Sequence, residues 1–288
     1  MSETFNQIEF RDMRTADITV GLELCRASRW NQLQHDWELF LTLSPAGCRV
    51  AVKYGRVVGT VTTVSYQNKF SWIGMVLVDP AERRQGLGTK LLQEALGIPR
   101  WQQSIGLDAT PAGREVYLKL GFVDDCRLSR METVVSAGIA RGDQNPARRM
   151  VESDWQAVCE LDRAVFGADR RTLLEWLFDA AQEYAWGIFR GEKLLGFTLG
   201  RHGFNFEQLG PVVAEDREVA AQLVSACLAE QTGKTFILDA TLHDEEWRQW
   251  LESAGFREQR PFIRMFRGEV PVRQESGRQF AILGPEFG

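Results

Sequence analysis

The chain has 288 residues and a formal net charge of −5, from 34 basic and 39 acidic side chains. Its hydrophobic fraction of 44% is ordinary for a globular protein and is enough for each of two domains to bury a core. Because no long block of one charge occurs, we expect no nucleic-acid partner. Because no apolar run approaches the ~20 residues of a membrane span, we expect no membrane partner either.

The N-terminal segment, the cysteines and the histidines bear on compartment and metal binding. Met1 to Asn6 lack the basic-then-apolar pattern of a secretory signal, so we expect a cytoplasmic protein. The five cysteines are widely spaced and set among apolar residues, which favours buried, reduced thiols over disulfides. The three histidines are isolated and have no metal-ligand spacing, so we expect no bound metal.

The first stretch that suggests a binding site runs from Arg29 to Trp37. Trp30 and Trp37 flank Asn31 and Asp36, and two tryptophans beside acidic groups suit a cationic amine with an apolar or aromatic body. The competing interpretation is that the tryptophans, seven residues apart, share one helical face and fill the core. Trp30, Asn31 and Trp37 are the residues predicted to contact a substrate.

The most informative segment is a glycine turn between a strand and a helix. An apolar strand, Ile73 to Val78, runs into Asp79-Pro80 and then Arg83-Arg84-Gln85-Gly86-Leu87-Gly88, after which a helix is predicted over Thr89 to Leu96. Glycines let backbone N–H groups converge on a ligand, and the helix N-terminus adds a positive field. The two arginines add donors suited to phosphate oxygens, so the segment predicts a site for a diphosphate.

Spacing narrows the kind of diphosphate site. A Walker A loop needs four residues between its first glycine and Gly-Lys-Ser/Thr, whereas one residue separates Gly86 from Gly88. The dinucleotide fingerprint needs a third glycine where Leu91 stands. What remains is Arg-x-x-Gly-x-Gly after a Val-rich strand.

A second block follows downstream. The strand end Leu107 to Thr110 is followed by the turn Pro111-Ala112-Gly113 and by a short helix from Arg114 to Leu120. Gly121-Phe122 ends this helix, and Tyr117 lies four residues before that pair.

These blocks, with a hairpin pattern at residues 48–66 before them, resemble the GCN5-related N-acetyltransferase (GNAT) superfamily over residues 7–135. The resemblance implies that the loop amides hold the pyrophosphate of coenzyme A and that the preceding strand pairs with the pantetheine arm. It also implies that a backbone N–H near Val76 polarises the thioester carbonyl. The residues implied to bind acetyl-CoA are Met75, Val76, Leu77, Val78, Arg83, Arg84, Gln85, Gly86, Leu87, Gly88, Thr89 and Lys90.

The same resemblance implies catalytic roles. Tyr117 is expected to protonate the departing thiolate, and a core aromatic is the alternative. The family often has a carboxylate on the strand before the loop, but residues 72–78 contain none. Asp108, at the end of the next strand, is the predicted base, directly or through water. A turn or capping role for Asp108, and a mechanism without a base, are the alternatives.

The chain also repeats itself. Leu107-Asp108-Ala109-Thr110 returns as Leu238-Asp239-Ala240-Thr241, and Arg130-Met131 returns as Arg264-Met265. Each Arg-Met pair stands nine residues after the glycine of a Gly-Phe pair. Several matches in the same order indicate two copies of one α/β fold.

The second copy lacks the features expected of a coenzyme site. Between its strand at 209–213 and its helix at about 218–230 stand Ala214-Glu215-Asp216-Arg217, a shorter loop with no glycine pair and two carboxylates. Negative charge disfavours a diphosphate, and Leu251 stands where the first copy has Tyr117. We therefore expect one coenzyme per chain, bound in the first copy, and a second copy that supports the first and closes its cleft.

Turn-forming residues at 136–146 separate the copies. This predicts a catalytic domain at 1–138, a degenerate GNAT-like domain at 139–267 and a tail at 268–288 that docks on the body. The tandem arrangement and the ending Gly-Pro-Glu-Phe-Gly resemble a bacterial group in which an acetyltransferase domain is fused to a divergent second one. The predicted fold class is α/β of the α+β type, with two GNAT-like domains, each a mixed, mostly antiparallel twisted sheet flanked by helices.

The predicted function is transfer of an acetyl group from acetyl-CoA, the cosubstrate, to a primary amine of a small molecule. A monomer or homodimer is expected. A protein acceptor is disfavoured because the second copy is expected to restrict the cleft. The alternatives are an acetyl-CoA-binding sensor without turnover, which the missing strand carboxylate favours, and a purely structural pair of domains.

Overall fold

The structure, a computed structural model, describes residues 8–98, 104–136, 146–271 and 275–288. The predicted boundary between residues 138 and 139 lies outside these ranges. The elements of the first half are β1 (Ile8–Asp12), α1 (Ile18–Ala27), α2 (Gln34–Leu43), β2 (Cys48–Lys53), β3 (Arg56–Tyr66), β4 (Phe70–Val78), α3 (Leu87–Gly97), β5 (Ser104–Ala109), α4 (Pro111–Lys119) and β6 (Val123–Val134). Those of the second half are β7 (Arg148–Arg149), α5 (Trp155–Phe166), α6 (Arg171–Ala180), β8 (Trp186–Arg190), β9 (Lys193–Arg201), β10 (Glu207–Ala214), α7 (Arg217–Ala229), β11 (Thr235–Thr241), α8 (Glu245–Ser253), β12 (Arg257–Gly268) and β13 (Gln279–Ile282).

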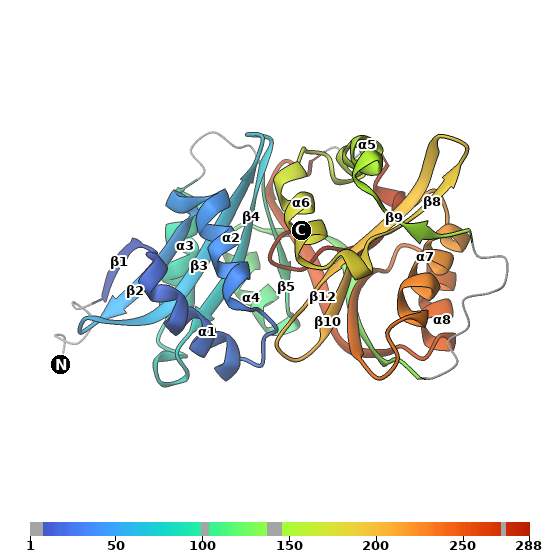
Figure 1. Cartoon of the computed structure of the whole chain (residues 1–288). Helices are drawn as coiled ribbons and strands as arrows, with labels where there is room; N and C mark the ends of the chain where they lie inside the picture. The colour runs from blue at the N-terminus through green and yellow to red at the C-terminus, as the bar shows by residue number, and fades with distance from the viewer. Residues whose placement is uncertain (1–7, 99–103, 137–145, 272–274) are drawn as a thin grey trace.

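The thirteen strands of the described residues form one continuous sheet, with helices on its faces (Figure 1). Their order is β1-β2-β3-β4-β5-β12-β6-β11-β13-β10-β9-β8-β7. Only β4–β5 and β10–β11 run parallel among the paired strands of this described part of the chain, so the sheet is mixed and mostly antiparallel. The predicted fold class is confirmed, and the sheets of the two halves are joined into one.

Apolar side chains cover both faces of this sheet. Val50 and Val52 point into one core and Ala51, between them, into another, as the alternation of a strand requires. On the first face, α1, α2, α5 and α6 share a core that crosses both halves. On the second face, α3 and α4 pack on the first half and α7 and α8 on the second.

The last strand of each repeat pairs with the other half. β6 lies between β12 and β11, and β12 lies between β5 and β6. The strand β5 of the first half is therefore completed by a strand from near the end of the chain. In this register Asp108 stands opposite Arg264, and Asp239 stands opposite Arg130.

Two buried ion pairs stabilise this exchange of strands, in which β6 and β12 each pair with the other half. Arg264 donates from Nε and Nη2 to the two oxygens of Asp108, at 2.9 Å each. Arg130 donates in the same way to Asp239, at 2.7 and 2.8 Å. A forked guanidinium–carboxylate contact is strong and specific in its geometry. The residues that the sequence repeat singled out thus pair across the copies and not within them.

Each half contains a wedge where two parallel strands separate. In the first half, β4 and β5 pair only at Ser71 with Ile105 and at Trp72 with Gly106. Beyond these pairs the strands diverge, and the gap between them leads to the turn at residues 83–88, called here the glycine loop. The wedge of the first half is therefore the place where a ligand can lie between strands.

The second wedge is filled by the chain itself. After their short pairing at Gln208 and Ile237, β10 and β11 separate and β13 inserts between them. β13 pairs with β10 at Val212 and with β11 at Asp239 and Ala240.

From β13 the chain continues into the core shared by the halves, and Figure 1 shows its end between them. The ring of Phe287 stacks on Phe40 with centroids 4.7 Å apart. The Tyr66 hydroxyl donates to the carbonyl of Phe287, and Trp72 Nε1 donates to that of Pro285, each at 2.8 Å. The tail is thus held by residues of the first half.

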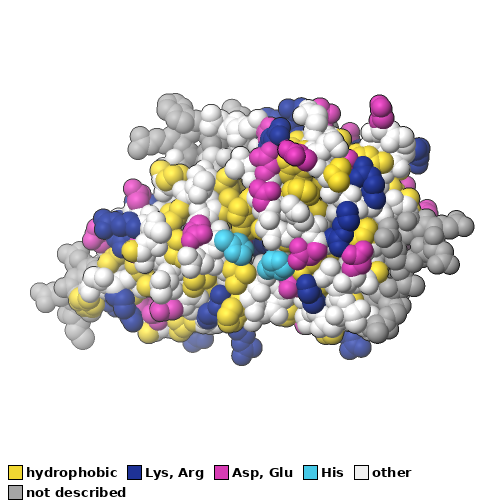
Figure 2. Space-filling model, in the orientation of Figure 1, with side chains coloured by type: hydrophobic (Ala, Val, Ile, Leu, Met, Phe, Trp, Pro, Cys, Tyr) yellow, Lys and Arg dark blue, Asp and Glu magenta, His cyan; other side chains and the backbone are white. Residues whose placement is uncertain are grey.

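Acidic and basic side chains of the described residues are mixed on the face drawn in Figure 2, so this face does not carry charge of one sign. Among the helices that the structure describes, none is both long and apolar enough to cross a membrane.

Candidate active site

The glycine loop is held open by local contacts. Asp79 accepts a hydrogen bond from the Ala81 N–H at 2.9 Å and so shapes the turn after β4. Arg83 donates from Nε to the carbonyl of Val78 at 3.0 Å and from Nη2 to Ser28 Oγ at 3.1 Å. Gly86 has a φ of +78°, and a Cβ placed there would meet no atom within 4 Å.

The loop fits an anionic ligand. α3 starts at Leu87, and its first helical bond runs from the Lys90 N–H to the carbonyl of Gly86. The N–H groups before Lys90 have no partner within the helix, and the positive end of its dipole lies beside them. Arg83 and Arg84 are exposed at the same place. These donors and charges are what a pyrophosphate requires.

A bulge in β4 fixes the backbone next to the wedge. Met75 has a φ of +51°, and Met75 and Val76 together stand opposite one residue of β3, Val61. Thr60 Oγ1 donates to the carbonyl of Met75 at 2.8 Å. Because C=O and N–H point in opposite directions in a trans peptide, the N–H of Val76 points away from Thr60. A bulge leaves such an amide outside the ladder and available to a ligand.

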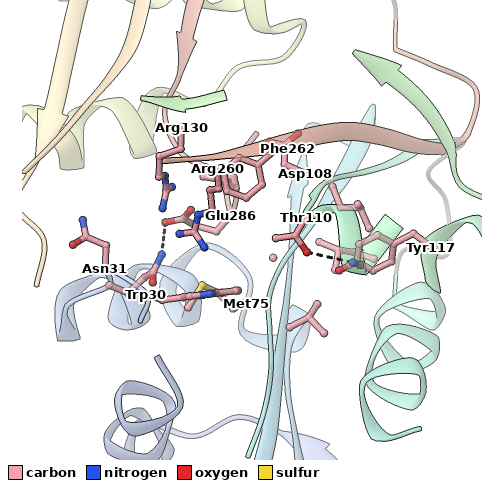
Figure 3. Close-up of a pocket in the computed structure, with 17 residues that line it drawn as sticks. Trp30, Asn31, Met75, Asp108, Thr110, Tyr117, Arg130, Arg260, Phe262 and Glu286 are labelled. Atoms are coloured by element: carbon pink, nitrogen blue, oxygen red, sulfur yellow. Dashed lines mark hydrogen bonds between the residues drawn. The ribbon is translucent and has the colours of Figure 1, made fainter. Parts of the chain in front are cut away.

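Adjoining hollows follow the wedge. A groove of about 290 Å³ runs along the glycine loop, and a cavity of about 280 Å³ lies beyond it. Val76, Gly113 and Tyr117 line both hollows, and Figure 3 shows Tyr117 among the residues of the cavity. All the predicted coenzyme residues except Gln85 and Lys90 line the groove, the cavity or the hollow beside Ser28.

Tyr117 lies where the groove meets the cavity. Its ring is 6.0 Å from that of Phe122, and a Cβ at Gly113 would come within 3.0 Å of it, so glycine makes room for the ring. Burial raises the pKa of Tyr117 to about 12. Within the described residues, no hydrogen bond holds its hydroxyl. Tyr117 therefore keeps its proton at neutral pH and has it free to give.

Charged side chains form the far wall of the cavity (Figure 3). Arg130 and Arg260 come from the exchanged strands β6 and β12, and Glu286 comes from the tail. Glu286 accepts hydrogen bonds from Gln32 Nε2, at 2.8 Å, and from Arg201. Burial raises the pKa of Glu286, but the Arg201 guanidinium and the hydrogen bond from Gln32 together hold that pKa below its ordinary value.

Asp108, the predicted base, lines the cavity, but both of its oxygens accept hydrogen bonds from Arg264. The matching Asp239 is bound in the same way to Arg130. An identical pair in the half without a glycine loop indicates a structural role. The base role of Asp108 stays a prediction that this geometry disfavours.

The three predicted substrate residues lie in different places. Trp30 and Asn31 line the cavity. The Asn31 amide, however, also joins the halves, because it donates to the carbonyl of Phe206 and accepts from the N–H groups of Asn205 and Phe206.

Trp37 does not line the cavity, so the prediction that it contacts a substrate is wrong. It is fully buried, and its ring packs against Gly21 and lies 6.2 Å from that of Phe40. Trp30 precedes α2 while Trp37 lies within it, so the two tryptophans do not share a helical face.

The cavity wall contains residues that sequence reasoning missed, namely Gln32, Arg130, Arg260, Phe262 and Glu286. The repeat identified Arg130, but nothing in the sequence placed it at the site. Arg260 has no counterpart in the repeat, because counting back from the shared Arg-Met pairs puts Cys126 at its position.

Catalysis by a cysteine thiolate or by a bound metal ion finds little support among the described residues. The five cysteines are free, and burial raises the pKa of Cys25 and Cys48 to about 12. In the described residues, no group of three or more histidine, cysteine, aspartate or glutamate side chains is placed to hold a metal ion.

Comparison with known proteins identifies the family of both halves. A model described as "Acetyltransferase (GNAT) family" matches residues 12–122, and one described as "Acetyltransferase (GNAT) domain" matches residues 158–281. The chain is a tandem member of the GNAT superfamily. The second half is thus still recognisable as a GNAT domain, although it lacks the glycine pair and has Leu251 at the position of Tyr117.

Relatives of this GNAT protein are acyltransferases. It is 27% identical over 263 residues to the holothin acyltransferase of Pseudoalteromonas sp. (strain SANK 73390), covering 91% of this chain and 88% of the relative. It is 24% identical over 216 residues to the uncharacterized N-acetyltransferase YitH of Bacillus subtilis (strain 168), covering 75% and 76%. The chain is therefore an acyltransferase.

Solved structures share the fold. A putative acetyltransferase from Pyrococcus horikoshii superposes with a TM-score of 0.82 at 23% identity, over 99% of this chain and 97% of the other. A tandem GNAT protein from the clavulanic acid biosynthesis pathway gives 0.67 at 15% identity, over 92% and 100%. Both match the tandem arrangement along nearly its full length.

Proposed function

We propose that this protein transfers an acetyl group from acetyl-CoA to the primary amine of a small molecule, and that only the first half does so. One observation carries the proposal: Tyr117, with its proton retained, lies at the junction of the groove beside the glycine loop and the separate cavity. A donor in the groove and an acceptor in the cavity would meet at this residue.

The first half supplies the groups that an acyl thioester needs. The amides at the start of α3 and the two arginines would hold the pyrophosphate, and the wedge between β4 and β5 has room for the pantetheine arm. Acetyl-CoA would supply the activated acetyl group. The N–H of Val76, turned away from Thr60, would donate to the thioester carbonyl and stabilise the negative charge that develops on its oxygen.

Tyr117 would act as the general acid. As the amine nitrogen bonds to the acetyl carbon and the carbon–sulfur bond breaks, Tyr117 would give its proton to the sulfur and regain one from solvent. A tyrosine whose pKa is raised to about 12 is fully protonated at neutral pH, which this role requires.

The amine would lose its proton to water. Both carboxylates that line the cavity are engaged by arginine, Asp108 by Arg264 and Glu286 by Arg201, and are therefore poor proton acceptors. The sequence alternative in which a base is dispensable is the one this arrangement supports.

The cavity favours a small acceptor. At about 280 Å³, with β12 and the tail forming part of its wall, it suits a metabolite rather than a protein segment. The Pseudoalteromonas relative is named for acyl transfer to holothin, which is consistent with this choice.

The test is Tyr117→Phe, assayed by release of free thiol from acetyl-CoA against a panel of amines. We expect turnover to fall about 100-fold or more, as for loss of a general acid, while acetyl-CoA binding stays unchanged. Tyr54→Phe is the control, because Tyr54 is 69% exposed on the hairpin of the first half. Equal turnover would remove Tyr117 from the acid role. Tight acetyl-CoA binding with no transfer to any amine would favour the sensor alternative.

A further inference from the structure

The acceptor cavity contains a guanidinium that has no carboxylate partner among the described residues. Arg260 lines the cavity beside Phe262 and Arg130 (Figure 3). Its Nε is buried and makes no hydrogen bond, and its Cζ lies 5.3 Å from the centre of the Phe262 ring. The side chain is half-buried, and a charge that is partly withdrawn from water without an anionic partner is costly, so its retention requires a reason.

The fully buried arginines around the cavity are all neutralised. Arg130 is bound to Asp239, and Arg264 is bound to Asp108. Arg201 contacts both Asp36 and Glu286. Glu286 lies near Arg260 in Figure 3, but Arg201 and Gln32 occupy its Oε1.

The backbone places Arg260 where it is electrostatically unfavourable. A bulge at Gln259 shifts the register of β12, so that Arg260 stands directly opposite Arg130 on β6. Like charges opposite one another on neighbouring strands destabilise a sheet. Burial and the nearby Arg130 lower the pKa of Arg260 to about 10, and the side chain still carries its charge at neutral pH. A bound anion would relieve both the repulsion and the loss of hydration.

The anion would belong to the acceptor and not to the coenzyme. The glycine-loop residues line the groove, whereas Arg260, Arg130 and Phe262 line only the cavity. Trp30 and Phe262 add apolar surface to the same cavity. An acceptor that fits would carry an amine that reaches Tyr117 and an anionic group that reaches Arg260.

We infer that the acceptor is an amine that also bears a carboxylate, such as an α-amino acid, and that Arg260 binds this carboxylate through its forked donors. The inference rests on the proposed function, because it names the substrate class of the same site. A planar carboxylate matches the guanidinium fork, and a desolvated pair of this kind discriminates strongly against a ligand that lacks the anion.

The test compares α-amino acids with the amines that remain after their decarboxylation, measured by thiol release with wild type and Arg260→Met. We expect wild type to prefer the amino acid by about 10- to 100-fold in kcat/KM, a ratio typical of a hydrogen bond to a charged group. Arg260→Met should raise KM for the amino acid by that factor and leave the decarboxylated amine unaffected. Arg260→Lys should recover part of the loss. Arg257→Met, an exposed position three residues earlier on β12, should match wild type.

Direct binding separates this inference from the proposed function. Calorimetry with N-acetyl amino acids and with their amides needs no turnover, and only the acids should bind wild type and lose binding in Arg260→Met. If they do so while no amine is acetylated, the carboxylate site stands and the proposed function fails. If amines are acetylated but Arg260→Met weakens both substrate classes equally, the inference is overturned. A preference for aminophosphonates over amino acids would overturn the choice of carboxylate.

Discussion

The two wedges of the sheet have the same backbone framework, but the first borders an open groove and the second is filled by β13. In the first, the bulge of β4 sets Met75 and Val76 opposite Val61; in the second, the bulge of β10 sets Gly210 and Pro211 opposite Leu199. Val76 has an N–H to offer at this point, and Pro211 has none. The second wedge therefore lacks the donor that would polarise a thioester carbonyl.

The loops beyond the wedges differ in the same sense. Four carboxylates and one arginine, Arg217, line the hollow at the start of α7, whereas the start of α3 has glycines and two exposed arginines. The four carboxylates are Glu215, Asp216, Glu218 and Asp244. β13 then occupies the space between the strands of the second half. The two copies thus share the framework of the sheet and differ at the places where a ligand would lie.

The largest expected effect concerns the matched ion pairs. Asp108→Asn and Asp239→Asn each break one buried pair and leave an arginine unpaired, so each should lower the free energy of unfolding by about 3–5 kcal/mol. Chemical denaturation measures this loss. The turnover number per folded molecule should be similar in both variants. Loss of turnover in Asp108→Asn alone would restore Asp108 as the base.

Matched glycines test the loop. Gly86 and Gly191 both have positive φ and open space where a Cβ would lie, but only Gly86 lies at the wedge. Gly86→Val should weaken acetyl-CoA binding about 100-fold or more, because the valine would crowd the amides that are proposed to bond to the charged phosphates. Gly191→Val carries a similar backbone cost and should leave binding intact. Calorimetric titration with acetyl-CoA measures both affinities. Equal affinity of the two variants for acetyl-CoA would refute the assignment of the loop.

The pH dependence should reflect the ionisation of the amine and not that of the protein. The pKa of Tyr117 is raised to about 12, so its acid form persists across the usable range and gives no falling limb below about pH 11. Only the neutral amine reacts, so kcat/KM should rise about tenfold per pH unit until the amine pKa is reached. A rising limb near pH 5 would instead indicate a carboxylate base.

Local spacing in the sequence predicted the parts of the site that depend on neighbouring residues. The turn from Arg83 to Gly88, Tyr117 before its Gly-Phe pair and the existence of two copies all rest on residues close together in the chain. The fold class and the acyltransferase family followed from these and are confirmed. The helix boundary that separates Trp30 from Trp37 was misjudged, because a seven-residue spacing fits one helix as well as a loop followed by one.

The exchange of strands could not be predicted, and the repeat itself is the reason. Arg130-Met131 and Arg264-Met265 are equivalent in sequence, so pairing of Asp108 with either arginine is equally compatible with the pattern. Only the assembled sheet decides in favour of Arg264. Arg260 and Glu286 reach the cavity through that same assembly, which explains why no local signal marked them.

The exchange also has a consequence for how the protein is made. β5 is complete once the ribosome has passed Ala109, but its partner β12 does not begin until Arg257. During translation the nascent first half therefore lacks the strand that pairs with β5 in the folded protein until almost the whole chain has emerged. The native partner of β5 is thus made last, and cutting the gene at the join between the copies would separate paired strands.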